Sequence, residues 1–134
     1  YGPGLAGIIE LGRSQSGMDY QKIMLHRHDF RGRVQRLFQD IDLLVVPATA
    51  VASPTMAQMA KLGEDPDLIS ALLRYTCPFD MTGSPTITLP AGFTPQNTPI
   101  AFQFVARHFE EELLVRAGWA FQQVTDWHKR HPSL

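Results

Sequence analysis

The stretch Asp42-Leu43-Leu44-Val45-Val46-Pro47 decides the fold. Four branched apolar residues follow one another without alternation, and a proline then stops the run. A short apolar run of this kind is typical of a strand that is covered on both faces of its sheet. We therefore expect an inner strand over residues 42–46, in a domain where helices pack against a sheet.

Two more strands are expected nearer the C-terminus. Residues 85–90 contain the alternating, β-branched segment Thr86-Ile87-Thr88-Leu89 and close at Pro90. Residues 99–105 form a second apolar and aromatic run, and turn-forming residues fill the stretch between the two. The two strands are predicted to be antiparallel neighbours joined by a long loop.

Helices are expected before and after these strands. Apolar residues recur near the helical period over residues 18–39, where Ser16 or Asp19 is suited to cap the first turn. A second amphipathic helix is predicted over 109–126, with acidic residues at its start and basic residues at its end. Shorter helices are expected near 3–11 and 67–75, whereas 47–66 is expected to be rich in loops and 76–85 to be irregular. These elements predict the α/β fold class.

Composition excludes several classes of protein. The chain has 134 residues, with 12 basic against 13 acidic residues and a net charge of −1, so direct nucleic-acid binding is not expected. The single cysteine, Cys77, excludes an internal disulfide framework and a cysteine-based zinc site, and fits a reducing cytosol. No apolar run approaches the roughly 18 residues of a membrane span, and the start lacks a secretory signal. Because residue 1 is Tyr1 and not Met, we expect the chain to begin inside an open reading frame.

The polar residues do not form a complete catalytic or metal-binding set. Ser14 and Ser16 lie in a glycine-flanked loop, but no base accompanies either of them. A lysine base must be desolvated to act near neutral pH, and all three lysines lie in polar surroundings: Lys22, Lys61 and Lys129. Two histidine pairs, His26 with His28 and His128 with His131, lack the spacing or the further ligands of a metal site. The residues alone therefore predict no catalytic residue, no metal and no cofactor.

Five stretches together are similar to the C-terminal part of the amidase signature family. That family includes bacterial amidases, enzymes similar to fatty-acid amide hydrolase, and the A subunit of glutamyl-tRNA(Gln) amidotransferase. The stretches, in order, are residues 42–49, 78–85, 87–93 and 98–106, and Trp127-His128-Lys129-Arg130-His131-Pro132. The resemblance covers nearly the whole chain. No single stretch is decisive, so the resemblance rests on the order and spacing of all five.

The resemblance implies an α/β/α fold with a mixed sheet flanked by helices. It also implies hydrolysis of amides by a Ser, cis-Ser, Lys triad that lies upstream of the matched region. Residues 1–134 are then the C-terminal segment of an amidase signature domain whose catalytic N-terminal part is absent, and this chain alone is expected to be inactive. The implied partners are that N-terminal part and a small amide substrate. A homodimer is also expected, because self-association would hide the apolar surface that a segment leaves uncovered. The implied location is the cytoplasm, away from membranes, and no cofactor is implied.

The resemblance also implies that parts of this chain border the substrate cleft. The loop after the strand at 42–46 and the segment before Gly83 hold the candidate residues. These candidates are Pro47, Thr49, Leu68, Leu72, Tyr75, Thr82 and Gly83. The alternative is that these residues only pack the core.

Three other functions stay open. A fragment of the amidotransferase protein would release ammonia from glutamine, but residues 6–12 lack the arginine that usually holds the substrate carboxylate in that branch of the family. A free-standing, non-catalytic binding module is the second alternative. A complete small hydrolase that uses Ser14 or Ser16 is the third, and the missing base argues against it. A segment of a larger domain is expected to leave apolar surface uncovered or to self-associate.

Overall fold

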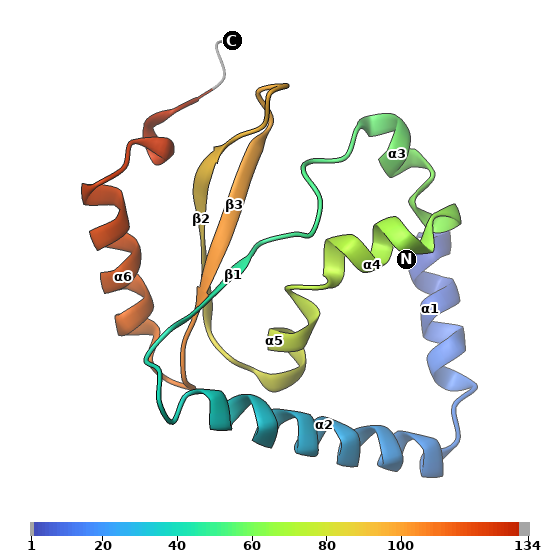
Figure 1. The fold of residues 1–134 in the computed structure, drawn as a ribbon. Coiled ribbons are helices and arrows are strands. Elements are labelled where there is room, and N and C mark those ends of the chain that lie inside the picture. The colour runs from blue at the N-terminus through green and yellow to red at the C-terminus, as the bar shows by residue number, and fades with distance from the viewer. Residues whose placement is uncertain (1, 132–134) are drawn as a thin grey trace.

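The computed structural model describes residues 2–131, and its elements follow the predicted order. Helices flank a small sheet on both faces, so the α/β class is confirmed (Figure 1). The helices are α1 (Pro3–Arg13), α2 (Gly17–Leu37), α3 (Met56–Ala60), α4 (Pro66–Leu73), α5 (Cys77–Thr82) and α6 (Glu111–Gln123). The 3-10 turns are η1 (Leu62–Glu64) and η2 (Trp127–Lys129), and the strands are β1 (Leu44–Pro47), β2 (Thr86–Phe93) and β3 (Pro99–Val105).

The sheet has the order β1-β3-β2, and both pairings in the described residues are antiparallel. The predicted hairpin of β2 and β3 is confirmed, with a bulge between Pro90 and Gly92. The expected inner position of the first strand is wrong for this part of the chain, because β1 lies at the sheet edge and Val45 is 58% exposed. An apolar run shows that a strand is suited to burial, but it does not show which neighbours cover it.

One face of the sheet packs against α2 and α5. The buried cluster there consists of Val34, Phe38, Phe79 and Val105. Its core-facing residues from β1, Leu44 and Val46, alternate with the outward Val45. Only the C-terminal half of α2 reaches this cluster. The N-terminal half is exposed, although its apolar residues continue the same period.

The other face packs against α6. Phe102 of β3 lies edge-on to Phe121 of α6, with ring centroids 4.9 Å apart. A Cβ atom at Gly118 would lie 3.2 Å from the Cδ1 atom of Ile87, so the missing side chain lets the helix approach β2 closely. This helix covers β2 and β3 but leaves β1 open on that face.

Several element boundaries differ from the predictions. The stretch 76–85 is not irregular throughout, because it contains α5, of six residues, and the loop-rich stretch 47–66 contains α3, of five residues. Such short helices show too little of the helical period to be recognised in the sequence. The last helix ends at Gln123, and His128 and Lys129 lie in the separate turn η2. The Ser16 cap is confirmed, since its side chain accepts a bond from the Asp19 backbone N–H. Pro132 of the fifth stretch lies outside the described residues.

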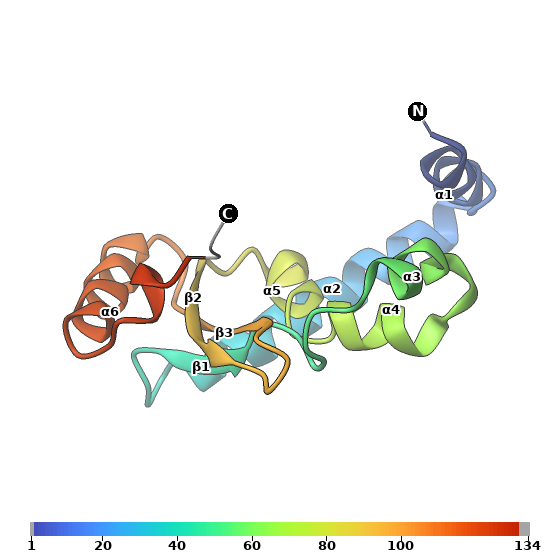
Figure 2. The same ribbon diagram turned by 90° about the horizontal axis from the view of Figure 1, so that it is seen from above.

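The chain exposes more surface than its mass predicts. Its accessible area is 9963 Å², whereas a folded protein of this mass exposes about 7,000 Å². Figure 2 shows the reason, because α1 and the start of α2 extend away from the sheet. Exposed apolar side chains gather on these two helices: Leu5, Ile8, Leu11, Met18, Tyr20, Ile23 and Leu25. The expected uncovered apolar surface is therefore present. Within residues 2–131, no helix combines the length and apolarity needed to cross a bilayer.

Candidate functional site

A hollow of about 520 Å³ lies beside the loop that follows β1. We call it the β1-loop hollow. Its lining residues are Pro47 to Pro54, Leu72 of α4, and Pro99, Ile100 and Ala101 at the start of β3. None of these side chains carries a charge, so the hollow suits a neutral group better than an ion.

Backbone hydrogen bonds hold the loop in place. The N–H of Ala48 donates to the Ala101 carbonyl at 3.0 Å, which extends the pairing of β1 with β3. The N–H of Ala50 donates to the Ala71 carbonyl at 3.0 Å, which fixes the loop to α4. The Thr49 hydroxyl donates to the Val51 carbonyl at 2.6 Å and is therefore engaged within the loop. Hydrogen bonds to the sheet and to α4 therefore fix the position of the loop that lines the hollow.

The seven predicted cleft residues fall into two groups. Pro47, Thr49 and Leu72 line the β1-loop hollow together. The remaining four lie outside it: Leu68, Tyr75, Thr82 and Gly83. For all seven residues, contact with a substrate stays a prediction.

Thr82 and Gly83 lie at the C-terminal end of α5, where their local roles are clear. Thr82 is 1% exposed, and its hydroxyl contacts the Phe79 carbonyl at 3.2 Å and the Ser84 hydroxyl at 2.9 Å. Gly83 ends the helix with φ of +72°, a left-handed conformation that glycine adopts without strain. The Thr82 side chain is therefore buried and hydrogen-bonded in this part of the chain, and its place in the substrate cleft stays a prediction.

His108 holds this helix end, and sequence reasoning missed it. Its Nε2 atom lies 3.0 Å from the Thr82 carbonyl oxygen, while its Nδ1 atom lies 3.3 Å from both the Arg31 guanidinium and the Gln35 amide nitrogen. Because Arg31 and Gln35 can only donate here, we assign the neutral tautomer with the proton on Nε2. Nearby, the Nε atom of Arg27 donates to the Met81 carbonyl at 2.7 Å. These donors satisfy carbonyls that the short helix leaves unpaired.

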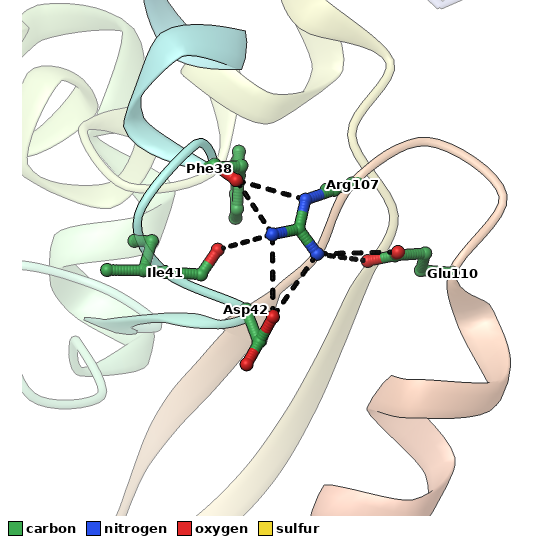
Figure 3. Close-up of polar contacts among 5 residues, drawn as sticks. All are labelled: Phe38, Ile41, Asp42, Arg107 and Glu110. Carbon is green, nitrogen blue, oxygen red and sulfur yellow. Dashed lines mark hydrogen bonds and ion pairs between the residues drawn. The ribbon is translucent and has the colours of Figure 1, made fainter.

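Arg107 joins three elements next to this cluster (Figure 3). Its guanidinium donates to the carbonyl oxygens of Phe38 and Ile41 just after α2. It also lies 3.4 Å from an Asp42 carboxylate oxygen and 3.3 Å from Glu110, before α6. Sequence reasoning missed this residue as well. The one signal that could have found it is a cation two residues after the end of an apolar strand, β3.

Both serines and two of the three lysines weighed as catalytic residues make local polar contacts. The Ser14 hydroxyl donates to the Leu11 carbonyl at 2.8 Å, and Ser16 caps α2. Lys22 and Lys129 lie beside Asp19 and Asp126. Lys129, through its hydrogen bond and its charge, lowers the pKa of the Asp126 carboxyl below its ordinary value. Among residues 2–131, no histidine, cysteine and carboxylate side chains gather as a metal site.

Comparison with known proteins shows similarity to amidases and to an amidotransferase subunit. A model of the amidase family matches residues 5–115. The chain is 45% identical over all 134 residues to a protein of Mycobacterium tuberculosis named putative amidase AmiD. It is 36% identical over 117 residues, 86% of the chain, to the A subunit of glutamyl-tRNA(Gln) amidotransferase from Roseiflexus sp.. The chain spans 28% and 23% of the lengths of these two relatives.

Solved structures support the same fold. A 6-aminohexanoate cyclic dimer hydrolase superposes with a TM-score of 0.85 at 22% identity, over 96% of this chain and 29% of that one. The A subunit of the amidotransferase from Thermotoga maritima gives a TM-score of 0.64 at 23% identity, over 84% of this chain and 24% of that one. At these identities the likeness concerns the fold.

Proposed function

Because this chain belongs to the amidase family, we propose that the full-length protein hydrolyses the C–N bond of a carboxylic amide. The observation that carries the proposal is the 45% identity over all 134 residues with the putative amidase. We propose that the chain is the C-terminal segment of the catalytic domain. It contributes part of the sheet, the core around Phe38 and Val105, and one wall of the substrate cleft.

The reacting groups come from the remainder of the protein in this proposal. The Ser14 hydroxyl donates to the Leu11 carbonyl and the Ser16 hydroxyl to the Asp19 carboxylate, and within residues 2–131 no hydrogen bond joins a lysine to either serine. Nucleophilic attack on an amide needs an activated oxygen. We therefore assign binding and positioning roles to this chain and no catalytic residue.

The β1-loop hollow supports a neutral amide as substrate. A charged group buried among these uncharged side chains would lose its hydration without gaining a partner. Glutamine carries two charges at neutral pH, so the lining favours a general amidase over the glutamine-hydrolysing amidotransferase. A fragment of that amidotransferase is the second candidate, supported by the 36% identity with the Roseiflexus protein. A non-catalytic binding module is the third.

Kinetics of the full-length protein separate these candidates. We expect kcat/KM for hexanamide or benzamide to exceed that for glutamine by about tenfold or more, because desolvating an unpaired charge is costly. Faster release of ammonia from glutamine would support the amidotransferase. Absence of hydrolysis with all three amides would support the binding module. We also propose a cytoplasmic location and a homodimer, which fractionation of cells and analytical ultracentrifugation would test.

A further inference from the structure

A second hollow, of about 400 Å³, lies between η2 and the β2–β3 hairpin. We call it the η2 hollow. Figure 1 shows η2, in red after α6, beside the hairpin end of the sheet. The lining residues are Pro90, Phe93, Asn97, Pro99, Trp127, His128, Arg130 and His131. It adjoins the β1-loop hollow, because Pro99 lines both. Its chemistry is nevertheless different, since it combines aromatic rings with basic side chains.

Arg130 supplies a positive charge in this hollow. Its guanidinium carbon lies 4.1 Å from the centroid of the Phe93 ring and 6.0 Å from that of Trp127. The two rings support it as cation–π partners. Among the described residues, no carboxylate forms an ion pair with Arg130. The nearby Asp126 is bound to Lys129 at 2.6 Å. A guanidinium held on aromatic faces keeps N–H groups that suit a carboxylate.

His128 adds an unsatisfied polar atom in the same lining. Its Nδ1 atom is buried and has no hydrogen-bond partner among the described residues. A buried polar atom without a partner is unfavourable, and native proteins rarely leave one. Because this atom is closed off from solvent, the His128 ring must turn toward the hollow before a protonated Nδ1 can donate to a ligand oxygen. The hollow therefore offers the Arg130 guanidinium and, once the ring has turned, His128 as donors, with no acidic side chain among its described lining residues.

We propose that the η2 hollow binds a small aromatic carboxylate. Arg130 pairs with the carboxylate, the Nδ1–H of His128 donates to it, and the flat body of the ligand lies against Trp127, Phe93 and the proline rings. The hollow lies within the volume range of small-molecule sites. Aromatic and proline walls distinguish this site from one for an inorganic anion, which needs no apolar surface. The proposal concerns binding and does not depend on the proposed amide hydrolysis.

Isothermal titration calorimetry of the full-length protein tests the proposal, with benzoate as the probe. Acetate has the charge without the ring, and benzyl alcohol has the ring without the charge. We expect benzoate to bind with a Kd of about 1 mM or tighter, as suits a ligand of this size, and more tightly than either half-probe. Arg130→Gln is expected to weaken this binding by about tenfold or more, because a charge-assisted pair is lost.

Matched variants complete the test. Arg116→Gln removes an exposed arginine on α6 outside the hollow and is expected to leave benzoate binding unchanged. His128→Leu is expected to weaken binding, and His128→Asn, which keeps a donor near Nδ1, to restore part of it. Benzoate that binds in the catalytic cleft would still bind to the Arg130→Gln variant and would be measured there as a separate site. If benzoate binds equally well to Arg130→Gln and Arg116→Gln, or if the rest of the protein fills the hollow and no Arg130-dependent binding appears, the proposal is wrong.

Discussion

The guanidinium of Arg107 donates two hydrogen bonds to the backbone carbonyl oxygen of Phe38, 69 residues earlier, at 3.0 Å from Nε and 2.7 Å from Nη2. Phe38 is the C-cap residue of α2, and its side chain belongs to the buried core. The two bonds satisfy a carbonyl that the helix itself leaves unpaired, and they place a cation at the negative end of the helix dipole. The Arg107 side chain thus fixes the C-terminal end of α2 next to the end of β3, after which the chain continues into α6.

Arg107→Gln is expected to destabilise the full-length protein by about 1–3 kcal/mol, since it leaves the Phe38 carbonyl without its donors. The matched control is Arg116→Gln, whose side chain is exposed on α6. Urea unfolding followed by circular dichroism would measure both variants. Equal midpoints for the two would show that Arg107 does not hold these elements together.

Thr82→Val tests whether Thr82 is a core residue or a cleft wall. The substitution keeps the shape of the side chain and removes bonds to Phe79 and Ser84. We expect a loss of about 1 kcal/mol in stability, with KM for a neutral amide unchanged. A changed KM at unchanged stability would show that Thr82 borders the substrate cleft.

Leu72→Ala tests the β1-loop hollow as part of the substrate cleft. Removing apolar contact with the acyl group is expected to lower kcat/KM for hexanamide about fivefold or more. The neighbouring Leu73 does not line the hollow and is 46% exposed, so Leu73→Ala is the control. Equal kinetics for the two variants would place the cleft elsewhere.

The isolated 134-residue chain is expected to show no hydrolysis of aliphatic or aryl amides above buffer. Loss of nucleophile and base together removes most of the rate of such an enzyme. The chain is also expected to self-associate, because it exposes apolar residues on α1 and α2. Ammonia release and light scattering would measure these properties. Turnover abolished by Ser14→Ala or Ser16→Ala would instead support a complete small hydrolase.

Lys129→Met is expected to raise the pKa of Asp126 toward 3.8, because the hydrogen bond and charge of Lys129 lower it. A carboxyl whose pKa is lower in the folded state stabilises the protein above its unfolded pKa. That contribution is lost as the pH falls through the folded pKa. Because the pair is exposed to solvent, we expect little change in stability at any pH. An NMR titration of the carboxyl carbon would report the pKa, and an unchanged value would exclude Lys129 as its cause.

The sequence by itself determined the elements that have a strong local signal. The apolar run predicted as a strand over 42–46, the alternating segment at 86–89 and the Ser16 cap each depend on neighbouring residues. All three are present, and the first strand spans Leu44–Pro47. The order and spacing of the five stretches likewise identified the family without a structure. Helices α3 and α5 were missed because one turn and a half carries little periodic signal.

Only the tertiary structure decided which residues meet across the chain. Arg107 contacts Phe38 and His108 contacts Thr82 over long separations, and neither pairing follows from residue type or spacing. The same holds for the burial of Thr82, for the joint lining of one hollow by Thr49 and Leu72, and for the basic and aromatic η2 hollow. The physical reason is that periodicity specifies which face of an element is apolar, whereas packing in three dimensions selects the partner of that face.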